Sequence, residues 1–132
     1  MKKQFVFAVA IAALSALFSC KKTDPKPTIS PAEGNWVGKY GSGNAVPTYY
    51  YAFQFNAGGT MSVKANDAIL PSTATGTWTI SGDSIRSTYT YTNAGGTFSM
   101  IGKYDGHTNI ISGTWGSDNN NKDGGTFTIT RQ

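Results

Sequence analysis

A single cysteine is the residue with the most distinctive chemical setting in this sequence. Cys20 stands two residues after the end of the apolar run 5–18, and Lys2 and Lys3 stand before that run. A charged start and a short apolar centre are typical of an export signal, and the run is too short to span a bilayer comfortably. We therefore expect residues 1–19 to be a removable signal peptide. A modified Cys20 would leave the chain no thiol for a disulfide, a metal site or nucleophilic catalysis.

The segment Leu17-Phe18-Ser19-Cys20 resembles the lipobox of bacterial lipoproteins. Leucine stands three positions before the cysteine and a small residue directly before it, whereas Phe18 departs from the usual pattern. The resemblance implies that the signal is cut before Cys20, that its thiol receives a diacylglycerol and that its amine is acylated. More than one acyl chain gives stable membrane anchoring. The alternative is an ordinary secretory signal in which Cys20 is incidental.

Other residues that commonly perform catalysis are sparse and poorly placed. His107 is the only histidine and lies in the expected turn 105–108, so a zinc site or a Ser-His-Asp triad has little support. Glu33 is the only glutamate, and the aspartates after residue 34 lie in turns or loops, where they usually bond their own backbone. The segment 118–124 fails the calcium-loop pattern because Lys122 takes the third ligand position. We expect no enzyme, no metal site and no cofactor.

The formal net charge of +4 does not point to a nucleic-acid partner. The lysines before residue 34 belong to the signal and to the segment 20–33, which is rich in proline and is expected to be a disordered tether. From residue 34 onward the basic residues are scattered and nearly balanced by aspartates, so no basic patch is expected. They are Lys39, Lys64, Arg86, Lys103, Lys122 and Arg131.

The remainder of the chain alternates apolar and polar residues with period two, interrupted by turn residues. This pattern predicts an all-β domain over residues 34–132. We expect eight strands, at 35–40, 48–56, 60–66, 75–80, 84–92, 97–104, 109–115 and 125–131. Most connections contain glycine, which supplies the positive φ that tight turns require. Eight short antiparallel strands form either a barrel or a sandwich, and closure into a barrel removes both sheet edges.

Three segments resemble the lipocalin-like (calycin-type) domains of lipoproteins from bacteria of the Bacteroides group. They are Gly34-Asn35-Trp36, Gly113-Thr114-Trp115 and the terminal 124–131, GGTFTITR. The resemblance covers residues 34–132 and implies an eight-stranded antiparallel up-and-down barrel. It also implies that Trp36 packs across the closed end and that Arg131 covers it.

Threading the strands alternately up and down predicts two unlike ends. The end with short turns receives Trp36, Phe55, Met61, Ile80, Ile85, Tyr104 and Ile129. The other end has the longer loops 41–47, 67–74 and 116–124 and many aromatic residues. Tyrosine combines an apolar ring with a polar tip, which suits the lining of a ligand site. The candidate ligand-binding residues are Tyr40, Tyr49, Tyr51, Tyr89, Tyr91 and Trp115.

These observations predict a lipid-anchored envelope lipoprotein whose barrel binds a small, largely apolar ligand or an exposed peptide. The alternative is a filled structural or interaction barrel, in which the tyrosines pack the interior and point their hydroxyls to water. We expect a monomer bound to the membrane through Cys20. An even number of strands places both ends of the domain at the closed end of the barrel. The membrane anchor would then lie on that side, and the end with the longer loops should face away from the membrane. The residues directly after Cys20 are Lys21 and Lys22, not the acidic run that the resemblance associates with export to the cell surface. The resemblance therefore implies that the protein is attached to the outer membrane with its domain in the periplasm.

Overall fold

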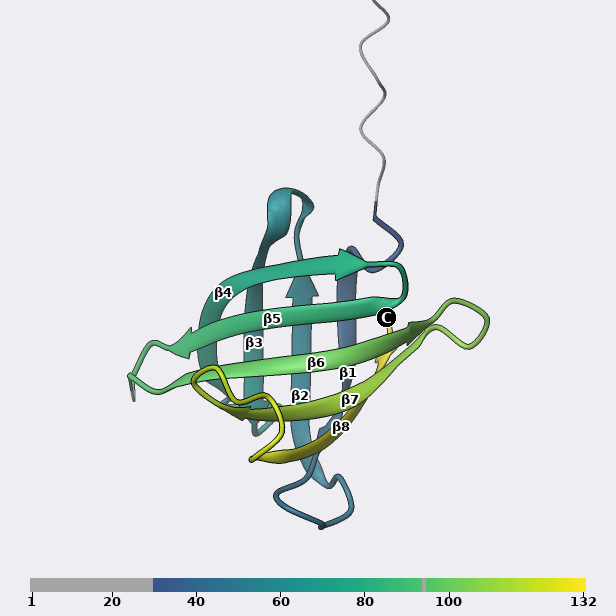
Figure 1. The fold of residues 1–132 in the computed structure, drawn as a ribbon. Helices are drawn as coiled ribbons and strands as arrows, with labels where there is room; N and C mark the ends of the chain where they lie inside the picture. The colour runs from purple at the N-terminus through teal and green to yellow at the C-terminus, as the bar shows by residue number, and fades with distance from the viewer. Residues whose placement is uncertain (1–29, 94) are drawn as a thin grey trace, which may run out of the picture.

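The computed structural model describes residues 30–93 and 95–132, and nearly all of its regular structure is β (Figure 1). Its elements are β1 (Gly34–Tyr40), β2 (Tyr49–Phe55), the 3₁₀ turn η1 (Ala57–Gly59), β3 (Thr60–Asn66), β4 (Ser72–Ser81), β5 (Ser84–Tyr91), β6 (Thr97–Asp105), β7 (Ile110–Ser117) and β8 (Gly125–Arg131). None of the described segments is a helix long and apolar enough to cross a membrane.

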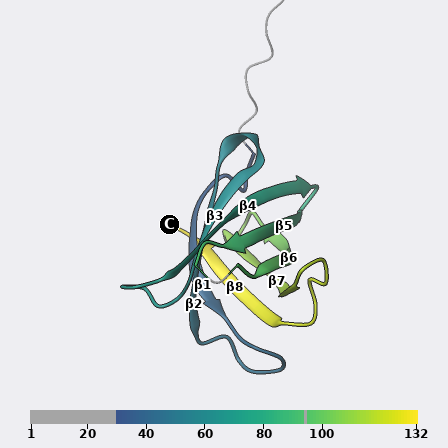
Figure 2. The same ribbon diagram turned by 90° about the vertical axis from the view of Figure 1, so that its left-hand side faces the viewer.

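The eight strands form one closed barrel in sequence order, and every neighbouring pair is antiparallel. Closure comes from β1 and β8, which pair from Trp36 opposite Arg131 to Tyr40 opposite Phe127. Figure 2 shows the sheet curving round on itself. The predicted up-and-down eight-stranded barrel is therefore confirmed. The largest shift in a strand boundary is in β4, which begins at Ser72 because Ser72 pairs with Ala65 of β3.

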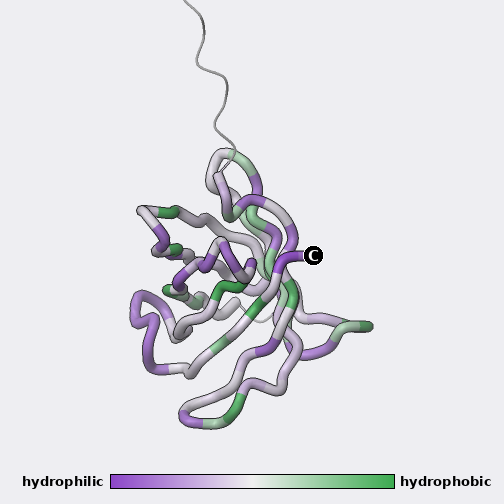
Figure 3. Tube along the Cα trace, turned by 90° about the vertical axis from the view of Figure 1, so that its right-hand side faces the viewer, coloured by the Kyte–Doolittle hydropathy of each residue, from purple (hydrophilic) through white to green (hydrophobic). Residues whose placement is uncertain are grey.

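Side chains from alternate positions of each strand point into the barrel and fill its closed half, as period-two patterning requires. The expected residues of this end are buried or packed against the core, with Ile80 and Tyr104 at its margin. Figure 3 shows the corresponding alternation of apolar and polar segments along the barrel wall. The core of the closed end contains Trp36, Phe55, Met61, Val63, Trp78, Ile85, Met100, Ile111 and Ile129.

Three inward-facing glycines lie where neighbouring strands approach each other too closely for a side chain. A Cβ at Gly38, Gly76 or Gly113 would overlap a backbone carbonyl of the adjacent strand. Two of them, Gly76 and Gly113, stand two positions before a tryptophan on the same inward face. Glycine in a barrel strand commonly marks this kind of bend and close backbone approach. The repeated Gly-x-Trp pattern therefore combines a close approach of two strands with a large inward ring.

The segment before β1 covers the closed end of the barrel. Ala32 is fully buried, and its carbonyl accepts a hydrogen bond of 2.8 Å from Nε1 of Trp36. The Arg131 guanidinium lies over the Trp36 ring, with 4.7 Å from Cζ to the ring centroid. It also donates to the carbonyls of Glu33 and Pro31. Residues 30–33 were predicted to be the end of the tether, and in the structure they pack on the barrel.

Candidate ligand-binding site at the open end

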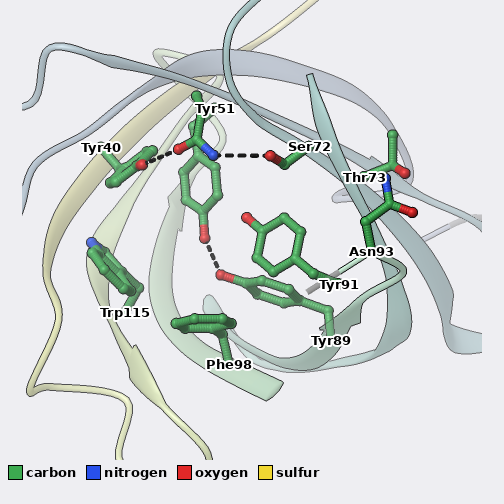
Figure 4. Close-up of a pocket in the computed structure, with 10 residues that line it drawn as sticks. Tyr40, Tyr51, Ser72, Thr73, Tyr89, Tyr91, Asn93, Phe98 and Trp115 are labelled. Carbon is green, nitrogen blue, oxygen red and sulfur yellow. Dashed lines mark hydrogen bonds between the residues drawn. The ribbon is translucent and has the colours of Figure 1, made fainter. Parts of the chain in front are cut away.

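A cavity of about 260 Å³ opens at the end of the barrel opposite residues 30–33, where β1 ends and β2 begins (Figure 4). Five of the six predicted ligand-binding residues line it: Tyr40, Tyr51, Tyr89, Tyr91 and Trp115. The remaining lining residues are Asn66, Ser72, Thr73, Asn93 and Phe98. The structure thus brings together, from β1, β2, β5 and β7, side chains far apart in sequence.

Tyr49 is the predicted residue that does not line the cavity. It begins β2 and pairs with Tyr40 of β1, so it shares the inward face but lies one step beyond the cavity. Its side chain is 54% exposed, and its ring packs against that of Tyr40 at a centroid distance of 5.4 Å. The assignment of Tyr49 to the site is therefore corrected to a place on the outer rim.

Tyr51 and Tyr89 form the floor of the cavity. Their hydroxyls hydrogen-bond to each other across the barrel, from β2 to β5, and each residue is only 2% exposed. Beneath them Phe53 and Phe127 pack at ring-centroid distances of 4.4–6.1 Å. The two phenols separate the filled half of the barrel from the open half. The filled-barrel alternative expected these hydroxyls to point to water. They point to each other instead.

A hydrogen-bonded chain fixes one side of the rim. The Tyr40 hydroxyl donates to Oδ1 of Asn66, and Nδ2 of Asn66 donates to Oγ of Ser72 at 3.1 Å. Asn66 has a φ of 74°, a left-handed conformation that asparagine tolerates better than most residues. Sequence reasoning missed Asn66 and Ser72. The turn residue at the end of an expected strand was the available signal for Asn66.

The other side of the cavity is a wall of aromatic rings. Trp115 lies 5.4 Å from Tyr40 and 6.0 Å from Phe98, measured between ring centroids, and its Nε1 donates to the carbonyl of Gly41 at 2.9 Å. Phe98 in turn lies 5.5 Å from Tyr91. Phe98 was not among the predicted ligand-binding residues. We call the six rings of Tyr40, Tyr51, Tyr89, Tyr91, Phe98 and Trp115 the aromatic belt.

The electrostatic character of the cavity is neutral. Among the described residues that line it, none has a charged side chain. Burial raises the pKa of Tyr91 to about 12 and raises the pKa values of Tyr40, Tyr51 and Tyr89 as well. All four phenols therefore keep their protons at physiological pH and can donate hydrogen bonds.

In the turns 105–108 and 118–124, aspartate carboxylates accept hydrogen bonds from nearby backbone N–H groups. Asp105 accepts a hydrogen bond from the backbone N–H of His107 at 2.9 Å, which lowers the pKa of Asp105. Asp123 accepts one from the backbone N–H of Ser117 at 2.8 Å. Within residues 30–93 and 95–132, no three histidine, cysteine or acidic side chains are grouped closely enough to hold a metal ion.

The predicted signal peptide, Cys20 and residues 20–29 of the predicted tether lie outside the described residues. No model of a known protein family matches the chain, and neither a curated protein nor a solved structure matches it. The resemblance to lipocalin-like lipoproteins, with the lipid anchor it implies, stays a prediction.

Proposed function

We propose that this protein is a lipid-anchored envelope protein that binds a small, largely apolar ligand at the open end of its barrel. The observation that carries the proposal is the cavity lined by the aromatic belt, in which Tyr51 and Tyr89 form the floor. Ligand sites are typically concave and mostly apolar, with a few placed polar groups, and this cavity has that composition. The closed half of the barrel is filled by its core, so binding is assigned to the open half alone.

A protein-binding role at the same end is the second candidate, and a specific observation favours it. Ile69 and Leu70, in the loop between β3 and β4, are 87% and 85% exposed. The carboxylate of Asp67 accepts hydrogen bonds from both of their backbone N–H groups, at 2.6 and 3.0 Å. The turn therefore holds two aliphatic side chains in water beside the mouth. In this second candidate function, the partner is a protein with an exposed peptide that contacts this loop.

The proposed orientation follows from the position of residues 30–33. They pack on the closed end of the barrel, so a lipid at Cys20 would hold the membrane on that side. The cavity would then face the aqueous compartment, which we propose to be the periplasm beneath the outer membrane. The support for this location is the lipobox-like segment and the lysines that follow it.

Substituting Cys20 with serine should move the protein from the detergent phase to the aqueous phase in a phase-partition experiment. The serine hydroxyl is not the thiol that lipid transfer needs, and the anchoring acyl chains would be lost. Ser19→Ala keeps a small residue before the cysteine and is the matched control, which should stay in the detergent phase. A Cys20→Ser protein that still partitions into detergent would contradict the anchor.

The ligand itself is tested by native mass spectrometry of the full protein purified from its own envelope. We expect a small molecule to accompany the wild-type barrel. Tyr51→Phe and Tyr89→Phe keep the buried rings but remove the hydroxyls at the floor, and they should lower the bound fraction several-fold. Tyr50→Phe, on the outward face beside Tyr51, is the control and should retain the ligand. A wild-type barrel without a bound molecule would contradict the proposal.

A further inference from the structure

The size of the cavity limits what it can hold. An apolar protein cavity of about 150 Å³ accepts benzene, and sites for drug-sized ligands begin at about 300 Å³. At about 260 Å³, this cavity lies between the two. A molecule of one or two rings is the size that fits.

The walls favour a flat ligand. The rings of the aromatic belt contact one another around the cavity, with Tyr40 and Tyr51 at 5.0 Å, Tyr40 and Trp115 at 5.4 Å, and Tyr91 and Phe98 at 5.5 Å between centroids. The hydroxyl pair of Tyr51 and Tyr89 completes the circuit. Aromatic rings pack favourably in offset-stacked or edge-to-face arrangements, and an inserted ring can make both with this lining.

The hydrogen-bond donors of the cavity are not all used. The Tyr40 hydroxyl donates a hydrogen bond to Asn66, and the Trp115 N–H donates one to the carbonyl of Gly41. Tyr51 and Tyr89 share one hydrogen bond, so one of their two protons is free to donate. The Tyr91 hydroxyl points into the cavity in Figure 4 and has no hydrogen-bond partner in the described part of the chain. The Tyr91 hydroxyl is therefore an unpaired donor directed at the space where a ligand would lie.

The charges around the mouth argue against an ionic ligand. The lining residues are uncharged, and the phenols are protonated at neutral pH, as tyrosines ordinarily are, with burial raising the pKa values of Tyr51 and Tyr91 further. The carboxylate of Asp67, in the loop after β3, is occupied by the N–H groups of Ile69 and Leu70. An anion would give up its hydration without gaining a partner of opposite charge, which is strongly unfavourable, and a cation would gain only the attraction of the aromatic faces.

We infer that the cavity takes an uncharged aromatic molecule of one or two rings bearing an acceptor oxygen, which receives a hydrogen bond from the Tyr91 hydroxyl. The rings of the aromatic belt bind the flat body of the ligand, and the hydrogen bond from Tyr91 fixes its orientation. This inference rests on the proposed binding function and names the class of ligand.

Calorimetric titration of the full protein with four ligands of similar size tests the inference. Naphthalene has no acceptor, acetylnaphthalene adds a neutral carbonyl oxygen, naphthoate is an anion and naphthylmethylammonium is a cation. We expect acetylnaphthalene to bind about three- to tenfold more tightly than naphthalene, the effect of one net hydrogen bond. Both ions should bind more weakly than naphthalene.

The Tyr91→Phe variant keeps the ring and removes the unpaired hydroxyl. It should bind acetylnaphthalene no more tightly than naphthalene, while its affinity for naphthalene stays the same as that of the wild type. Tyr50→Phe, on the outside of the barrel, should retain the preference for the ketone. Because the affinity for naphthalene must stay unchanged, a general loss of folding cannot imitate this result.

The outcomes separate the ligand class from the binding function. Tightest binding by either ion, equal binding of ketone and hydrocarbon, or a ketone preference that survives Tyr91→Phe would overturn the inference while leaving a small-ligand site in place. Failure of all four compounds to bind the wild-type protein would overturn both the inference and the proposed function.

Discussion

Replacing Trp36 with alanine should lower the free energy of unfolding by about 3–5 kcal/mol, the range typical for truncating a buried aromatic side chain. Trp36 is fully buried at the closed end, and its ring meets that of Tyr104 edge-on at 5.8 Å. The substitution would also remove the hydrogen bond to Ala32 and the ring beneath the Arg131 guanidinium. Urea unfolding followed by circular dichroism measures the loss.

Lys39→Ala is the control for Trp36→Ala. Lys39 lies on the same strand, β1, but its side chain is exposed on the outward face. Surface substitutions of this kind usually change stability by less than about 0.5 kcal/mol. If Trp36→Ala cost less than about 1 kcal/mol, the packing of residues 30–33 and Arg131 around the tryptophan would not be what closes this end of the barrel.

The Gly76→Ala substitution adds only one methyl group and should still destabilise the protein by about 2–3 kcal/mol. The new Cβ would overlap the carbonyl oxygen of Thr88 and would lie 2.6 Å from Cα of Tyr89. Both atoms belong to the backbone of β5, so relief requires the two strands to separate. Thermal unfolding should show a lower midpoint, and native-state hydrogen exchange should show faster exchange along β4 and β5.

Gly106→Ala adds the same methyl group where there is room for it. Its Cβ would come no closer than 3.4 Å to the Tyr104 ring, an ordinary van der Waals contact, and Gly106 does not have a positive φ. We expect a change within about 0.5 kcal/mol. Equal effects at Gly76 and Gly106 would show that β4 and β5 can move apart easily, contrary to the close contact described.

The barrel was accessible from the sequence because its signals are local. Alternation of apolar and polar residues marks a strand, and glycine-containing turns mark where it reverses. The start of β4 was missed because Ser72 and Thr73 resemble a polar loop. They belong to the strand because β3 offers partners for them, opposite Ala65 and Lys64. A pairing of that kind is decided by the neighbouring strand and is not visible in the segment itself.

The sequence indicated which residues form the candidate site, but not how deep in the barrel each of them lies. Parity places Tyr49, Tyr51 and Phe53 on the same inward face, yet the first is on the rim, the second forms the floor and the third lies in the core. Which level each occupies depends on how strands that are not neighbours meet across the barrel. The bond between the hydroxyls of Tyr51 and Tyr89 is such a contact, between β2 and β5. No local pattern indicates it.

The pairing of the first strand with the last has a consequence for how the chain reaches its native state. The edge of β1 finds its second partner only in residues 125–131, at the very end of the sequence. Until those residues are available, both edges of the sheet present unpaired backbone groups, which can pair with other chains and cause aggregation. Contacts of such long sequence separation also slow folding, because the chain must order a large loop before they form. A nascent chain that lacks its last strand is therefore expected to be especially prone to aggregation.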